Sequence, residues 1–382
     1  MIDLELHPSD SKKSLPPNEL QDYLHQYQQI FFEPQIPDAF TAKIEFDNLI
    51  LIGIGGSAMG ARFMARFFRN QTQKKLIVLD NIHPDWVCEQ LASIDLKRSL
   101  CVSVSKSGNT LETLVLTNML AEKYQALNLP LDQHFYLVSD PGHGQLATFA
   151  KQYSIDLIEM PAKVGGRFSL FTEAATVPLA LLGVDVVKLC SQAQKGFQNI
   201  LGTKFNVVQT LGEFLYHNHT AGRNNLVIFN YEPRLSWFGS WAAQLICESL
   251  GKQNLGFQVV SARGTTDQHS MTQHWKQGTD NTIMVFIEPK TFTHPTSVQY
   301  QNQTLELGSL TRAFLSANQQ VFHDLKRPSC KFSITDSTQD LVDLSCLWLL
   351  TTAYLGAKFQ INAFDQPAVD FSKRILQKNL KI

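Results

Sequence analysis

The apolar run Leu49–Ile54, closed by glycines, constrains the fold more than any other part of this sequence. A continuous apolar run of this length is typical of a strand buried on both faces, as in a parallel sheet covered by helices. The next segment, Met59–Phe68, repeats apolar residues at helical spacing. A buried strand that leads through glycines into a helix begins a βαβ unit, so the sequence predicts an α/β protein.

The same alternation of apolar runs and helical patterns continues along the chain. In the first half we expect further strands at 76–79, 100–104, 134–138 and 155–159, and helices at 84–93 and 110–124. After mainly helical patterns over 170–220, we expect strands at 226–229, 257–260, 282–287 and 331–335, and helices at 237–250, 269–277, 309–321 and 339–357. This order predicts two α/β domains, each a doubly wound, mostly parallel sheet between two layers of helices.

A length of 382 residues fits two domains of about 150 residues each with additional terminal segments. We expect an N-terminal helical or irregular segment over 1–45, a first α/β domain over 46–184, a second over 185–358 and a C-terminal helix over 359–382. Pro367 suits the first turn of that last helix. Its apolar residues, which we expect to pack against the body of the protein, are Val369, Phe371, Ile375 and Leu376.

The composition excludes several classes of function. With 33 Lys+Arg against 34 Asp+Glu, the chain lacks the basic excess of a nucleic-acid-binding protein. Its six cysteines are scattered without a CxxC pair, which argues against a disulfide or zinc framework and favours a reducing compartment. The acidic N-terminus and the lack of an apolar run of about 18 residues argue against a signal peptide and a membrane span. We therefore expect a cytoplasmic protein that binds neither nucleic acid nor membranes.

The loop that follows the first buried strand, Gly53–Ala58, fits two interpretations. Its sequence matches the GxGxxA form of the dinucleotide-binding fingerprint, and Asp80 ends the next strand where a ribose-binding acid would lie. In the alternative interpretation, the glycines only form a tight turn between a strand and a helix. This loop alone does not decide between them.

A second loop, Ser105–Thr110, follows the strand expected at 100–104 and opens a helix at Leu111. It carries three hydroxyls and Gly108 at a helix N-terminus, where backbone amides and the helix dipole favour an anion. The alternative is a plain N-cap, which needs only one Ser or Thr. Since a dinucleotide site needs no such second loop, the two loops together favour one sugar phosphate held between two strand ends.

Three further segments carry side chains suited to catalysis. Arg167, in the Gly-rich loop 161–169, can stabilise negative charge on substrate oxygens or form a surface salt bridge. Glu248 lies four residues after Gln244 on one helix face, either as a general base or as a solvated glutamate. His269 follows a turn before the next expected helix and can exchange protons near neutral pH, or be structural. The chain has no HExxH motif, and we predict no catalytic metal.

Together these segments resemble the phosphoglucose isomerase family, which is built from paired sugar-isomerase (SIS) domains of flavodoxin-like topology. Six segments match in the family's order and cover the chain from about residue 50 to its end. They are Gly53–Ser57, Ser105–Thr113, Val164–Ser169, Gln244–Lys252, Gly264–Ser270 and Phe364–Lys373.

The resemblance implies an aldose–ketose isomerase of glucose 6-phosphate and fructose 6-phosphate that needs neither cofactor nor metal. Glu248 would move a proton between C2 and C1 of the opened sugar, and Arg167 would stabilise the cis-enediolate. His269 and Lys373 would open the hexose ring. The family's arrangement also implies an obligate homodimer in which His269 reaches the partner's site. The residues implied to bind the substrate are Gly56, Ser57, Ser105, Lys106, Ser107, Thr110, Gln244 and Gln366.

The sequence departs from the family pattern near its end, where Gln366-Pro367-Ala368-Val369-Asp370 replaces the usual Gln-Trp-Gly-Val-Glu and Ser372 replaces a glycine. Thr266-Asp267 also replaces the common Asn-Gly. Two other functions remain open: a bifunctional isomerase that also accepts mannose 6-phosphate, and a non-catalytic sugar-phosphate sensor. A sensor would need the loop Ser105–Thr110 but not Glu248, His269 and Lys373 together.

Overall fold

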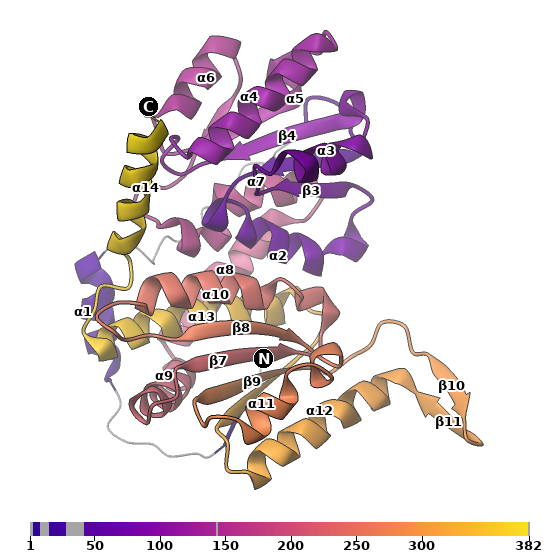
Figure 1. Cartoon of the computed structure of the whole chain (residues 1–382), viewed down its shortest axis with the longest axis vertical. Coiled ribbons are helices and arrows are strands. Elements are labelled where there is room, and N and C mark those ends of the chain that lie inside the picture. Colours follow the sequence, from indigo (N-terminus) through magenta and orange to yellow (C-terminus); the bar gives the residue numbers. More distant parts are fainter. Residues whose placement is uncertain (1–2, 8–14, 28–41, 143, 381–382) are drawn as a thin grey trace.

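The computed structural model describes residues 3–7, 15–27, 42–142 and 144–380. In this part of the chain two five-stranded sheets are stacked, with helices between them and on their outer faces (Figure 1). The prediction of an α/β protein with two doubly wound parallel sheets is therefore confirmed. The domain boundaries drawn from the sequence stay predictions.

The first sheet is entirely parallel and has the order β3-β2-β4-β5-β6. Every residue of its central strand β4 is buried, as expected for a strand with helices on both faces. Its strands all lie within two residues of the expected bounds: β2 (Asn48–Ile52), β3 (Lys75–Leu79), β4 (Ser99–Val104), β5 (Phe135–Ser139) and β6 (Leu157–Glu159). The helices of this half are α2 (Met59–Phe67), α3 (Pro84–Ala92), α4 (Leu111–Ala126), α5 (Leu131–His134), α6 (Gln145–Tyr153) and α7 (Glu173–Leu181).

The second sheet has the order β1-β12-β9-β7-β8 and differs from the first at one edge. There β1 (Asp3–His7) pairs antiparallel with β12, although the sequence led us to expect only a helical or irregular segment over 1–45. The other strands are parallel: β7 (Asn225–Asn230), β8 (Gln258–Arg263), β9 (Thr282–Pro289) and β12 (Ser329–Ile334). Its helices are α8 (Val186–Leu201), α9 (Phe205–Thr220), α10 (Phe238–Leu250), α11 (Thr272–Gln277), α12 (Leu307–Asp324) and α13 (Thr338–Phe359).

The sequence patterns missed one further structure, a hairpin of β10 (Ser297–Tyr300) and β11 (Gln303–Glu306) that projects away from the second domain (Figure 1). The described N-terminal helix is α1 (Pro17–Tyr27), inside the segment 1–45 that we expected to be helical or irregular.

One apolar core joins the two domains. Its buried residues come from both sheets and from the helices between them. At its centre the ring of Phe63 on α2 lies 5.5 Å from that of Phe238 and 5.7 Å from that of Trp241 on α10. This packing holds the first loop after β2 close to α10.

The C-terminal helix α14 (Pro367–Leu380) begins at Pro367, as expected. Its apolar side chains, however, do not pack against the body of the protein. Phe371 is 61% exposed, and Val369, Ile375 and Leu376 are also exposed. The expectation of a packed helix is therefore wrong for the isolated chain: these side chains are exposed, and α14 runs along the side of the first domain (Figure 1).

Candidate active site

The two anion-type loops lie at the same edge of the first sheet. The loop 53–57 follows β2 and the loop 105–110 follows β4, and these strands are neighbours. The chain leaves β2 for β3 on one side and returns to β4 on the other, so the strand order reverses between the two loops. Ligands of open α/β sheets bind in the crevice at such a switch point, outside the carboxyl ends of the strands.

The loop 105–110 is held by its own hydroxyls. The Ser105 hydroxyl donates to Thr110 Oγ1 at 3.0 Å, and the Asn109 amide donates to Ser107 Oγ at 3.2 Å. Gly108 has a φ of +64°, which glycine adopts without strain. Thr110 is the N-cap residue of α4 but its side chain does not cap the helix, so the first amides of α4 remain available to a ligand.

Lys106 points away from this helix end. Its ammonium donates to the carbonyl of Ala162 at 2.6 Å and lies 3.9 Å from a carboxylate oxygen of Asp140. Burial raises the pKa of Asp140, and the Lys106 charge counteracts part of that rise. The lysine side chain therefore links the loop to the segment that leads to Arg167.

Glycine is required where the first loop meets the Arg167 loop. A Cβ on Gly56 would lie 2.2 Å from the carbonyl carbon of Gly166, and the Ser169 hydroxyl donates to the Gly56 carbonyl at 3.2 Å. On the other side, a Cβ on Gly55 would lie 2.7 Å from Nε2 of Gln244. The loop after β2 thus fits between the Arg167 loop and α10.

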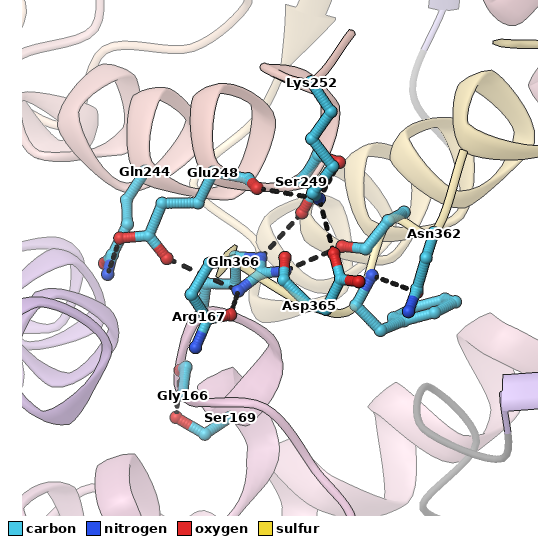
Figure 2. A network of polar contacts seen from close by, with 12 residues as sticks. Gly166, Arg167, Ser169, Gln244, Glu248, Ser249, Lys252, Asn362, Asp365 and Gln366 are labelled. Carbon is cyan, nitrogen blue, oxygen red and sulfur yellow. Dashed lines mark hydrogen bonds and ion pairs between the residues drawn. The ribbon is translucent and has the colours of Figure 1, made fainter. Parts of the chain in front are cut away.

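Arg167 is the centre of the polar network in Figure 2. Its side chain is only 2% exposed, and the pKa of the guanidinium is lowered by burial and raised in part by Glu248 and Asp365. Nε donates to Ser249 Oγ at 2.7 Å, and Nη2 donates to the carbonyls of Ala363 and Asp365 at 2.8 and 2.9 Å. These bonds fix two of its three nitrogens to the protein.

The third nitrogen, Nη1, contacts two side chains that were predicted from the sequence. It donates to Gln366 Oε1 at 2.5 Å and lies 3.4 Å from Glu248 Oε2. The other Glu248 oxygen accepts from Gln244 Nε2 at 3.2 Å. The Glu248 side chain is 34% exposed, so its carboxylate can reach a ligand although it lies beside the buried Arg167 guanidinium.

Two predicted residues lie outside this network. His269 follows a short helical turn after β8, and Lys373 lies on α14; both are exposed. Within the described ranges neither side chain forms a hydrogen bond or an ion pair. In the described part of the chain, the predicted substrate residues Ser57, Ser105, Ser107 and Thr110 also form no hydrogen bond with Arg167 or Glu248.

Sequence reasoning assigned no role to three members of the network: Ser249, Lys252 and Asp365. All three stand inside matched motifs, so their positions were visible in the sequence although their function was not. Lys252 donates to the carbonyls of Glu248 and Ser249 at 3.1 and 2.7 Å and lies 3.3 Å from an oxygen of Asp365.

A cavity of about 670 Å³ reaches Glu248 and Gln366 from the side of α14. Its lining also includes Lys252, Asp365 and Val369, but none of the residues of the loop 105–110. This cavity therefore does not include the loop after β4.

The dinucleotide interpretation fails at its acidic residue. Asp80 pairs with Arg62 at 2.7 Å, and that guanidinium lies over the ring of Trp237 at 3.6 Å. The carboxylate expected to bind a ribose instead bonds to α2. Among the described residues, no group of three or more His, Cys, Asp or Glu side chains could hold a metal ion, and no helix is long and apolar enough to cross a membrane.

Comparisons with known proteins cover most of the chain. The family model described as phosphoglucose isomerase matches residues 10–321. A probable glucose-6-phosphate isomerase of Methanococcus maripaludis is 30% identical over 88% of this chain and 79% of its own length. A glucose-6-phosphate isomerase of Thermus thermophilus is 29% identical over 87% of this chain and 84% of its own.

Solved structures have the same fold. A hypothetical protein of Thermus thermophilus superposes with a TM-score of 0.83 at 26% identity, over 95% of this chain and 91% of that one. The glucose-6-phosphate isomerase of Chlamydia trachomatis superposes with a TM-score of 0.80 at 22% identity, over 97% of this chain and 76% of that one.

Two doubly wound α/β domains define the class: a protein with the paired SIS-domain fold that solved phosphosugar isomerases share. Within that class, the match over most of its length places the chain in a single family. It belongs to the phosphoglucose isomerase family.

Proposed function

We propose that this chain interconverts glucose 6-phosphate and fructose 6-phosphate. The observation that carries the proposal is the joining of Glu248, Arg167 and Gln366 in one network beside the loops of the switch point. Members of the chain's family are named for this reaction, and the network offers a group for each chemical step after ring opening.

The phosphate would bind in the crevice between the loops 53–57 and 105–110. Ser57, Ser107 and Thr110 supply hydroxyls, and the uncapped start of α4 supplies amides and a positive dipole end. Because Lys106 is occupied with Ala162 and Asp140, we expect it to act mainly through its backbone and through loop position. Gly56 lets the first loop lie directly against the Arg167 loop, since any side chain there would strike that loop.

Glu248 is suited to move the proton. After ring opening, its carboxylate would take the proton from C2 and return it to C1, so one group serves as base and then as acid. Gln244 orients it through one oxygen, at 3.2 Å. The Gln244 Oε1 atom is buried without a hydrogen-bond partner among the described residues, so it is available to accept a bond from a sugar hydroxyl.

Arg167 is suited to stabilise the enediolate between the two proton transfers. Two of its nitrogens are fixed by Ser249 and backbone carbonyls, so the guanidinium need not reorganise as negative charge develops. Nη1 is bound only by the side chains of Gln366 and Glu248, which can yield to a substrate oxygen. Its buried position makes the interaction stronger than it would be in water.

Ring opening would require His269 and Lys373, and neither belongs to the network formed by the chain itself. We propose a homodimer in which His269 of a second copy completes the site. The uncovered apolar face of α14 supports this, because a helix face with Phe371 61% exposed calls for a partner. The Glu248 cavity also opens beside α14, where a second copy could enter. The six free cysteines fit a cytoplasmic location.

The test is a coupled assay of fructose 6-phosphate formation from glucose 6-phosphate, with mannose 6-phosphate in a parallel reaction. The proposal predicts conversion of glucose 6-phosphate with no added metal or cofactor. Equal conversion of mannose 6-phosphate would instead indicate the bifunctional enzyme. Tight binding of either sugar phosphate without turnover would indicate a sensor and contradict the proposal.

A further inference from the structure

Arg167 is held by groups from two segments that are far apart in the sequence. The end of α10 provides Ser249 and Glu248, and the segment between α13 and α14 provides the carbonyls of Ala363 and Asp365. Figure 2 shows these two segments approaching the guanidinium from different sides. The position of Nη1 beside Glu248 therefore depends on how the two segments are fixed relative to each other.

Lys252 bonds to both segments. Its ammonium donates to the carbonyls of Glu248 and Ser249, which lie at the C-terminal end of α10 and lack helical partners. The same atom lies 3.3 Å from the Asp365 carboxylate, and the backbone carbonyl of Asp365 accepts from Arg167. The Lys252 side chain is only 12% exposed, in contrast to 51% for that of Asp365.

Lys252 does more than cap the C-terminal end of α10, because it also pairs with Asp365. A capping lysine needs only the last carbonyls of its helix and keeps its head in water. Here burial lowers the pKa of Lys252, and Asp365 counteracts the shift. Lys252 lies between the C-terminal end of α10 and the Asp365 carboxylate. It therefore fixes the distance between α10 and the segment that carries Asp365.

We propose that Lys252 and Asp365 are positioning residues for the isomerase reaction, which together hold Arg167 against Glu248. This inference rests on the proposed function. Neither residue touches the substrate in this account: they act through the Asp365 carbonyl, the end of α10 and the guanidinium. Because the Asp365 carboxylate is half exposed, its ion pair adds little to global stability, and we expect the effect of removing that carboxylate in the reaction rather than in folding.

The test compares Lys252→Met, Asp365→Asn and the double variant with the wild-type protein. Displacement of a catalytic group can cost up to about 100-fold in rate, so we expect each single variant to lose about 10- to 100-fold in kcat. KM should stay within about twofold, because the phosphate crevice is untouched. Since the two residues act as one pair, the double variant should be no slower than the slower single variant.

The matched control is Lys43→Met. Lys43 also donates to a backbone carbonyl, that of Asp132 at 2.8 Å, and pairs with an aspartate, Asp156, at 2.6 Å, but its partners lie on the first domain away from the network. It should keep the wild-type kcat. Melting temperatures of all variants should stay within about 3 °C of the wild type.

A wild-type protein without isomerase activity would refute the proposed function itself. With an active wild type, unchanged kcat in Asp365→Asn would overturn the positioning role, and so would additive losses in the double variant. Asp365→Asn decides the matter if Lys252→Met does not fold, because its side chain is half exposed and keeps its size.

Discussion

At the scale of single residues, Arg167 and Glu248 are an ion pair with unequal environments. The guanidinium is buried and bonded on every nitrogen, whereas the carboxylate is one-third exposed and has two weaker contacts. Such a pair keeps the positive charge fixed while the carboxylate can approach a substrate. This difference assigns charge stabilisation to Arg167 and proton transfer to Glu248.

Replacing Glu248 by Gln should separate binding from chemistry. The substitution keeps the size of the side chain and removes the base, so kcat should fall by at least about 100-fold. Affinity for a sugar phosphate, measured by calorimetry, should be nearly unchanged because Glu248 forms no hydrogen bond with the proposed phosphate residues Ser57, Ser107 and Thr110 in the described structure. Near-normal turnover in this variant would show that another group moves the proton.

Replacing both Ser107 and Thr110 by Ala should have the opposite effect. Hydrogen bonds to a charged group contribute about 1.5–3 kcal/mol each, so substrate affinity should fall by at least about tenfold. The kcat at saturating substrate should change much less. If phosphate compounds bind these variants as tightly as the wild type, the crevice at the switch point is not the phosphate site.

The residues of the network could be predicted from the sequence only where a motif carries them. Gln244 and Glu248 share a helix face, and this follows from their spacing alone. That Lys252 contacts Asp365 does not follow, because it depends on how the segment after α13 folds back against the end of α10. The contact between the Ser249 hydroxyl and Arg167 could not be predicted either, because a serine near a helix end is common and needs no such partner.

At the scale of elements, three short segments bring the site together: the loops after β2 and β4 and the segment 164–169. The first and third are in backbone contact at Gly56. The glycine motif predicted a tight turn after β2, but the sequence did not show that this turn packs against the Arg167 loop.

Gly56→Ala should therefore force these two loops apart. The Cβ of the new alanine would lie 2.2 Å from the Gly166 carbonyl carbon, so the backbone of one of the two loops must shift to remove the overlap. Overpacking of this kind lowers the free energy of unfolding by about 1–3 kcal/mol. Arg167 should also move, because it lies on the displaced loop. We expect a lower melting temperature and a lower kcat.

The matched control for this variant is Gly165→Ala. Its Cβ would be 3.6 Å from the Phe168 ring, an ordinary contact, and its φ of −63° suits any residue. This variant should retain stability and activity. If Gly56→Ala were equally harmless, the backbone contact would not shape the site.

The buried strands were predictable and the exposed ones were not. The strands of the first sheet are continuous apolar runs because helices cover both faces, which leaves a clear signal. The hairpin β10–β11 is mostly exposed, so no apolar pattern marks it. In β1 only Leu4 and Leu6 alternate with polar residues, a pattern too short to predict a strand. Their strand conformation comes from pairing, and for β1 the partner is β12, at the other end of the sequence.

At the scale of the whole molecule, the continuous core between the sheets joins the two domains, and the proposed function adds a second copy to complete the site. His269 and Lys373 lie outside the network, and the apolar face of α14 is uncovered. The net charge of −1 is consistent with a phosphate held by hydroxyls, amides and a helix end rather than by a basic surface.

Hybrid dimers test whether two chains build each site. Glu248→Gln and His269→Ala chains should each be inactive alone. In a hybrid, one site would combine both defects and the other would be intact, so random exchange should restore about a quarter of wild-type activity. Two sites that each belong to one chain would give no recovery after verified subunit exchange.

The central claim, that this chain interconverts the two sugar phosphates by carboxylate-mediated proton transfer, is tested most directly by NMR of the reaction in D₂O with a chelator present. Incubation of glucose 6-phosphate through many turnovers should give fructose 6-phosphate with deuterium at C1, because a proton held on Glu248 exchanges with solvent. The Glu248→Gln protein should give neither product nor label over the same time. Failure to form fructose 6-phosphate, or formation of a product that stays free of deuterium after repeated turnovers, would contradict the account.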